Sequence, residues 1–190
     1  LGYLLLEDEL RKDAKQIINY FDKNDVSVKI ISGDNLSTVE TIASKVGVKD
    51  IHGIDLSTIK GSPDYNKLVK TYNIFTRVKP AQKKSLIQAF KKQGNTVAMT
   101  GDGVNDAPSI KSADIGVGMG ITGTDVTKNV ADMVLTDDNF ATIVGAVEEG
   151  RRIYDNIRKA IQFLLGSNMS EVLSIFTATL MGFTILKPVH

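Results

Sequence analysis

The sequence predicts an α/β domain built on a parallel sheet, followed by one long α-helix that includes a transmembrane segment. The domain is predicted because short apolar runs alternate with amphipathic stretches up to residue 139, as in βα units that form a parallel sheet. The helix is predicted because glycine and proline, which punctuate the first part, become sparse from residue 140. We therefore expect a sheet domain over residues 1–139 and a long helix over residues 140–186.

The first predicted elements are two strands with a helix between them. Residues 2–6 and 26–31 are apolar runs of strand length. Residues 11–24 carry an apolar face at helical spacing, formed by Ala14, Ile17, Ile18 and Phe21. This order is that of one βαβ unit.

The next helices are predicted from their end signals. Ser37 and Glu40 have the spacing of a capping box and Gly47 supplies a stop, which together predict a helix over 38–46. A weaker helix is expected over 63–72. The remaining elements are a helix closed by Gly94, a strand, a further helix and two closing strands, in the order 80–93, 96–99, 107–113, 115–117 and 133–135.

The turn at residues 100–108 has the sequence Thr-Gly-Asp-Gly-Val-Asn-Asp-Ala-Pro. Asp102 and Asp106 are hard oxygen ligands of the kind Mg²⁺ prefers, and the glycines let backbone N–H groups approach an anion. Because the turn follows a predicted strand, it lies where open α/β sheets bind their ligands. Tight turns in general use Asp, Gly and Asn, but the whole nine-residue string is too particular for an ordinary turn.

The composition limits the classes of partner. The chain has 23 Lys and Arg against 22 Asp and Glu, so its charge balance predicts no nucleic-acid partner. There is no cysteine, which excludes disulfides and thiolate metal sites.

Residues 163–183 form a stretch of about 21 residues with one charge, Glu171, which matches the length of a transmembrane helix. A buried core helix is the alternative, but the stretch is too long and apolar for the small sheet domain to cover. Basic residues precede this stretch at Arg151, Arg152, Arg158 and Lys159, and only Lys187 follows it closely. By the positive-inside rule, the sheet domain is expected to be cytoplasmic.

The predicted membrane segment contains its own polar pair. Asn168 and Glu171 are three positions apart, so they share one helix face. A carboxylate inside a membrane is costly, and such residues usually mark a functional site. The alternative is a polar pair satisfied by neighbouring helices.

Three separated elements resemble the motifs of haloacid-dehalogenase-like phosphotransferases: the Ser-Gly-Asp of 32–34, Lys83 on a helix after Pro80, and the acidic turn at 102–106. The amino-acid sequences of 100–108, 133–140 and 148–151 resemble those of the phosphorylation domain and fifth membrane helix of P-type cation-transporting ATPases, with the calcium pumps most similar. The resemblance implies a Rossmann-like parallel sheet of haloacid-dehalogenase type, with ATP as substrate.

Roles follow for the motif residues. Ser32, Gly33 and Asn105 are suited to bind a phosphoryl group, Lys83 to neutralise its charge, and Asp102 and Asp106 to hold Mg²⁺. The resemblance further implies that Asp34 and Arg77 lie near the nucleotide. It also implies that Asn168 and Glu171 bind the transported cation, with Ca²⁺ favoured.

Pumps of this family are phosphorylated on an Asp-Lys-Thr-Gly-Thr segment, and no such string occurs in the 190 residues. We therefore expect the chain to be a carboxyl-side piece of a larger pump, inactive by itself. The resemblance places the absent strand between those ending at Ser32 and Thr100. Another segment of the pump or another copy of the chain is expected to supply it, unless the sheet rearranges.

The leading hypothesis is thus an ATP-driven cation pump in a membrane, the plasma membrane if the source is prokaryotic. One alternative is a dehalogenase-like phosphatase with a terminal anchor. The other is a non-catalytic, Mg²⁺-binding, membrane-associated module.

Overall fold

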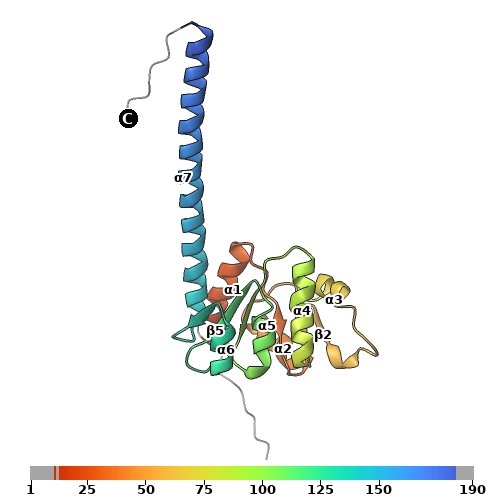
Figure 1. Ribbon diagram of the computed structural model, residues 1–190. Helices are drawn as coiled ribbons and strands as arrows, with labels where there is room; N and C mark the ends of the chain where they lie inside the picture. Colours follow the sequence, from red (N-terminus) through yellow and green to blue (C-terminus); the bar gives the residue numbers. More distant parts are fainter. Residues whose placement is uncertain (1–10, 12, 183–190) are drawn as a thin grey trace, which may run out of the picture. The chain divides into compact units, whose positions relative to one another are not determined.

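The computed structural model describes residue 11 and residues 13–182, so the strand predicted over 2–6 and Lys187 lie outside the described residues. The described chain alternates strands and helices as expected (Figure 1). The elements are α1 (Ala14–Lys23), β1 (Ile30–Ile31), α2 (Leu36–Lys45), β2 (Gly53–Asp55), α3 (Tyr65–Thr71), β3 (Ile74–Thr76), α4 (Pro80–Lys92), β4 (Ala98–Gly101), α5 (Ala107–Ile110), β5 (Ile115–Met119), α6 (Asp125–Val130), β6 (Met133–Leu135) and α7 (Phe140–Leu180). Short 3₁₀ helices cover Leu56–Thr58 and Val104–Asp106.

Within the described residues, the strands form two parallel sheets, each of three strands, with the orders β1-β3-β2 and β4-β5-β6. β3 is the centre of the first sheet, and all three of its side chains are buried. β2, β3 and α6 were not predicted, because each is too short to show a periodic pattern.

Helices cover both faces of the first sheet. On one face Phe75 packs with Leu86 and Phe90 of α4. On the other face Ile74 packs with Val39 and Ala43 of α2. Alternate residues of β3 therefore serve two separate apolar clusters, as the pleat of a strand requires.

The second sheet is covered in the same way. Met99 packs with Ile87 of α4 and Ile110 of α5, while Val117 and Leu135 face the beginning of α7 at Phe140 and Ile143. Glycine is required at Gly116, because a Cβ there would lie 2.7 Å from the Ile110 side chain. This close approach seats α5 against β5, immediately after the acidic turn in the chain.

The capping box predicted for α2 is wrong. The helix begins at Leu36, and the Asn35 side chain accepts the hydrogen bond from the Thr38 N–H at 2.9 Å. The earlier start lets Leu36 pack on the cluster formed by Val39 and Ile74. Gly47 and Gly94 follow their helices with φ of +85° and +82°, as predicted for helix stops.

β1 and β4 belong to different sheets, so within the described residues no strand ladder joins them. The predicted strand over 26–31 shortens to Ile30–Ile31, and both of these residues are only half-buried. Ile31 nevertheless packs near Met99 of β4. Within the described residues, β1 and β4 are each the edge strand of their own sheet.

The helix α7 runs for 41 residues without a break. Its first turn belongs to the sheet unit, residues 1–144, and the rest of the helix belongs to a second unit, residues 145–190. Large apolar side chains are exposed along the second unit, including Phe163, Leu165, Val172 and Phe176. By length and composition α7 is able to cross a membrane.

Candidate functional site

The acidic turn is shaped by close packing between Gly101 and Asp106. A Cβ on Gly101 would lie only 2.6 Å from the Cβ of Asp106, so glycine is needed at this position. The Asp106 N–H donates to the Gly103 carbonyl at 2.8 Å, which closes the turn as a 3₁₀ helix before α5. The chain thereby turns the Asp106 carboxylate inward.

Asp106 is paired with Lys83. The Lys83 Nζ lies 2.6 Å from Asp106 Oδ1, and the two side chains are 17% and 11% exposed. Pro80 starts α4 and places Lys83 in its first turn, pointing toward the end of β4. The contact joins residues 23 apart in sequence and brings together two of the predicted site residues.

Asp102 has an exposed side chain and a firmly held backbone. Its carbonyl accepts a hydrogen bond from the Thr124 N–H at 3.0 Å and one from the buried Thr127 hydroxyl at 3.4 Å. Sequence reasoning missed both threonines. The sequence signal that could have found them is the Thr-x-x-Thr spacing, which is typical of a capped helix start. In the structure the Thr124 side chain accepts from the Thr127 N–H and caps α6.

The turn offers a donor set that fits Mg²⁺. Asp106 Oδ1 contacts Lys83, while Oδ2 lies against Gly101 and Gly103 on the side of the turn. Asp102 adds a second, exposed carboxylate. Magnesium is commonly bound through one or two carboxylates together with water and phosphate oxygens. Within the described residues no cluster of three or more His, Cys, Asp or Glu side chains accompanies this pair.

Ser32, Gly33 and Asp34 form a second polar turn at the end of β1. The Ser32 hydroxyl donates to Asp34 Oδ2 at 2.9 Å and accepts from the Asp34 N–H at 3.1 Å. The Ser32 carbonyl accepts from the Val78 N–H at 3.1 Å, just before α4 begins. Arg77 has a φ of +52° and donates its N–H to the Asp34 carbonyl.

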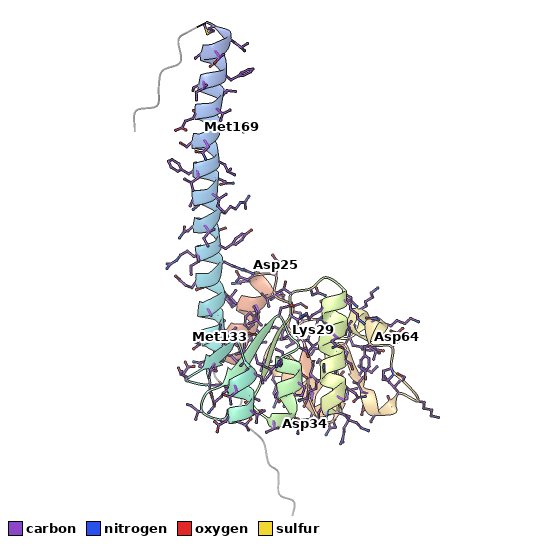
Figure 2. All side chains as sticks on the ribbon, viewed as in Figure 1. Asp25, Lys29, Asp34, Asp64, Met133 and Met169 are labelled. Atoms are coloured by element: carbon purple, nitrogen blue, oxygen red, sulfur yellow. The ribbon has the colours of Figure 1, made fainter. Side chains whose placement is uncertain are left out.

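The site residues predicted in the sheet domain therefore form two groups near the carboxyl ends of strands. One holds Lys83, Asp102, Asn105 and Asp106, and the other holds Ser32, Gly33, Asp34 and Arg77. No hydrogen bond of the described chain joins the groups directly, and both Gly33 and Asn105 are exposed. Figure 2 shows Asp34 at the lower edge of the domain and Asp25, which precedes β1, at the opposite edge.

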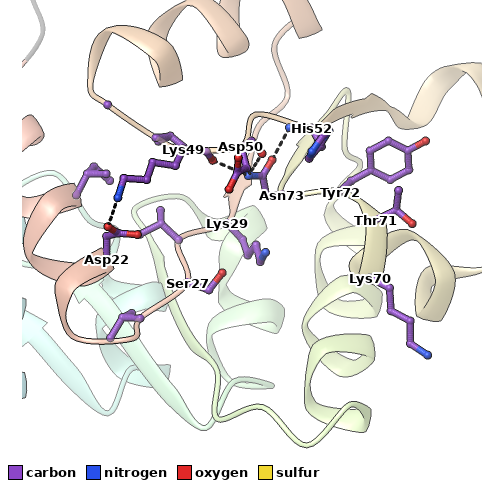
Figure 3. Close-up of a pocket in the computed structure, with 15 residues that line it drawn as sticks. Asp22, Ser27, Lys29, Lys49, Asp50, His52, Lys70, Thr71, Tyr72 and Asn73 are labelled. Atoms are coloured by element: carbon purple, nitrogen blue, oxygen red, sulfur yellow. Dashed lines mark hydrogen bonds and ion pairs between the residues drawn. The ribbon is translucent and has the colours of Figure 1, made fainter.

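A hollow of about 330 Å³ lies at the amino-terminal ends of the strands, away from the predicted site residues (Figure 3). It is lined by Lys29, Lys70, His52 and an ion pair between Lys49 and Asp22. Burial lowers the pKa of Lys29. None of the predicted catalytic or metal residues contributes to it.

Asn168 and Glu171 lie on the exposed length of α7, where both side chains are exposed. Their neighbours Met169 and Val172 are 65% and 63% exposed.

Comparisons with known proteins identify the family of the chain. A model of the haloacid dehalogenase-like hydrolases matches residues 1–114, and the chain belongs to this family. Its curated relatives are cation-transporting ATPases. Calcium-transporting ATPase 1 of Bacillus cereus is 44% identical over all of this chain. An endoplasmic reticulum-type calcium-transporting ATPase of Arabidopsis thaliana is 42% identical over 96% of it.

The chain covers 22% and 18% of those two relatives, so it spans about a fifth of their length. Among solved structures, a zinc-transporting PIB-type ATPase in the E2.Pi state matches with a TM-score of 0.68 and 31% identity. That match covers 94% of this chain and 24% of the other. The catalytic domain of a CPx-ATPase matches with a TM-score of 0.55 and 27% identity, covering 72% of this chain and 45% of that one.

Proposed function

We propose that this sequence forms part of the phosphorylation domain and the fifth membrane helix of an ATP-driven cation pump, with Ca²⁺ as the favoured cation. The observation that carries the proposal is the Lys83–Asp106 ion pair at the carboxyl edge of the sheet. A half-buried lysine paired with a buried carboxylate, beside a second, exposed carboxylate, suits phosphoryl transfer, which depends on positioning and neutralising charge. The relatives that match nearly the whole chain are cation-transporting ATPases, which favours a pump over a soluble phosphatase or a non-catalytic module.

Each predicted residue has a role in this proposal. Lys83 neutralises phosphoryl charge and orients Asp106, and Asp102 and Asp106 hold Mg²⁺, which when bound would neutralise the phosphoryl oxygens. Ser32, Gly33 and Asn105 donate hydrogen bonds to the phosphoryl group. Asp34 and Arg77 lie near the nucleotide, where their hydrogen-bonded turn presents polar groups beside Ser32.

The phosphorylated aspartate is proposed to come from outside these 190 residues. Its strand would lie between β1 and β4, whose facing edges have no ladder partner in the described residues. Unpaired strand edges readily accept another strand. Another segment of the same pump is the favoured source and a second copy of the chain the alternative. The isolated chain is accordingly proposed to be inactive.

The exposed apolar segment of α7 is proposed to span the membrane, with Asn168 and Glu171 as ligands of the transported cation. Exposed Phe, Leu and Ile side chains are stable in lipid but not in water. The basic residues before the segment favour a cytoplasmic sheet domain. In a prokaryote the membrane would be the plasma membrane.

The test uses the full-length protein that contains this sequence, in sealed membrane vesicles. Calcium uptake and calcium-dependent ATP hydrolysis are measured with Mg²⁺ and ATP. The proposal expects both, and expects both to be lost together in Asp106→Asn. ATP-independent calcium permeability, or hydrolysis that no cation stimulates, would rule the pump out.

A further inference from the structure

Asp138 makes contacts that neither the predicted site nor its proposed chemistry uses. Its carboxylate accepts hydrogen bonds from the Ile121 N–H at 2.9 Å and from the Thr122 N–H and hydroxyl at 2.7 Å each. Asp138 adopts a φ of +49°, a conformation uncommon for a residue with a side chain. The backbone of Asp138 thus has an uncommon conformation at the residue whose carboxylate binds Ile121 and Thr122.

The loop that Asp138 holds, residues 121–124, leads directly to the acidic turn. Two residues after Thr122, the Thr124 N–H donates to the Asp102 carbonyl at 3.0 Å. The loop lies close against the end of β5, and glycine is needed there, because a Cβ at Gly123 would lie 2.0 Å from the Met119 carbonyl oxygen. A displacement at Thr122 therefore reaches Asp102 within a few bonds.

The other side of Asp138 leads to α7. The helix begins at Phe140, and Phe140 packs on the cluster formed by Val117, Met119 and Leu135. The Gly120 N–H donates to the Leu135 carbonyl at 2.8 Å, which fixes the base of the same loop. The loop is therefore tied to the segment that leads into α7 at two points.

We propose that Asp138 is a positioning residue that couples the first turn of α7 to the acidic turn through the loop at 121–124. The coupling runs from the Asp138 carboxylate to the Ile121 and Thr122 amides, and from the Thr124 amide to the Asp102 backbone. Movement of either end displaces the other, because both ends share one short, sterically confined loop. This role rests on the proposed function, in which Asp102 binds Mg²⁺ and α7 spans the membrane.

The neighbouring Asp137 provides a matched control. Its carboxylate accepts from the Asn139 N–H at 3.1 Å and the Thr142 hydroxyl at 2.8 Å, so it serves only the start of α7. Removing either carboxylate deletes one charge and its local hydrogen bonds. Only removal of Asp138 breaks the connection to the loop.

Hydrogen exchange of the full-length protein tests the connection without depending on activity. In Asp138→Ala the amides of Ile121 and Thr122 lose a charged acceptor and should exchange about tenfold faster or more. The proposal requires faster exchange also at the Thr124 and Asp106 amides, which Asp138 does not touch. Asp137→Ala should leave all four unchanged. Faster exchange confined to Ile121 and Thr122 in Asp138→Ala would overturn the coupling.

Phosphorylation from ATP gives the second measurement. Asp138→Ala should raise the Mg²⁺ concentration for half-maximal phosphorylation about three- to tenfold, the size of a typical coupling effect. Asp138→Asn, which keeps an acceptor oxygen, should recover part of the loss, and Asp137→Ala should match wild type. An unchanged Mg²⁺ dependence in Asp138→Ala contradicts the inference. If wild type takes no phosphate from ATP, the proposed function fails instead, and hydrogen exchange still decides the coupling.

Discussion

The acidic edge of the sheet and the exposed part of α7 differ in how many of their side chains have partners within the described residues. Lys83 and Asp106 are enclosed and paired with each other, and Asp102 is held by Thr124 and Thr127. On α7, Phe163 and Phe176 are 76% and 59% exposed, and Glu171 is exposed among them. The first region is therefore explained by contacts within the described residues, whereas the second consists of apolar side chains that the described residues leave exposed.

The largest effect is expected from Lys83→Met in the full-length protein. The substitution leaves Asp106 charged in an enclosed position, and it removes the positive charge proposed for the phosphoryl group. Phosphorylation should fall about 10²- to 10³-fold. Lys84→Met is the control, because Lys84 is the adjacent, exposed lysine of the same helix. Equal losses in both variants would show that the enclosed pair has no special role.

A smaller effect is expected from Gly101→Ala. The new Cβ would lie 2.6 Å from the Asp106 Cβ, so Asp106 must move. Misplacing a catalytic group by about 1 Å costs about a factor of 10² in rate. Gly103→Ala controls for the loss of glycine itself, because its nearest neighbour, Asp106 Oδ2, is 3.7 Å away. Phosphorylation rates of the two variants should differ, and equal rates would mean that Asp106 tolerates displacement.

On α7 the expected effect is on cation affinity rather than on stability. Glu171→Gln should weaken the cation activation of ATP hydrolysis about tenfold or more, equivalent to at least about 1.4 kcal/mol. The melting temperature of the sheet domain should not change, because Glu171 is exposed and belongs to the second unit of the chain. Ser170→Ala, at the adjacent exposed position, is the control. Unaltered cation activation in Glu171→Gln would remove the residue from the cation site.

The smallest effect concerns acid stability at Asp138. The hydrogen bond from the Ile121 amide is the largest cause that lowers the pKa of Asp138 from 3.8 to about 2. A carboxyl group whose pKa is lowered by folding stabilises the fold above its unfolded pKa, and this contribution disappears as the pH falls through the folded pKa. Wild type should therefore exceed Asp138→Asn in thermal unfolding midpoint at pH 5, and the difference should close between about pH 4 and pH 2. A difference independent of pH would contradict this assignment.

Much of the site edge was predictable from the sequence, because turn residues after apolar runs mark the carboxyl ends of parallel strands. The contact of Lys83 with Asp106 follows this pattern. The stops at Gly47 and Gly94 were predictable for another reason, because glycine readily adopts the positive φ that ends a helix. The predicted metal, nucleotide and cation roles stay predictions.

Other features were not predictable, because they depend on tertiary contacts. Asn35 rather than Ser37 caps α2, since packing of Leu36 decides where the helix begins. The apolar run over 26–31 predicts a strand of six residues, but β1 contains only Ile30 and Ile31, since β1 pairs with a neighbouring strand on one side only. The hydrogen bond between Asp138 and Ile121 joins residues 17 positions apart, and no local sequence pattern predicts it.

The central claim is that Lys83, Asp102 and Asp106 belong to a phosphoryl-transfer site completed by an aspartate from outside these 190 residues. The most direct measurement is transfer of radioactive phosphate from ATP to the full-length protein with Mg²⁺, followed by acid quench and hydroxylamine treatment. The account predicts an acid-stable, hydroxylamine-sensitive label in wild type that is lost in Asp106→Asn. A wild-type protein without label, or a label that survives hydroxylamine, would contradict it.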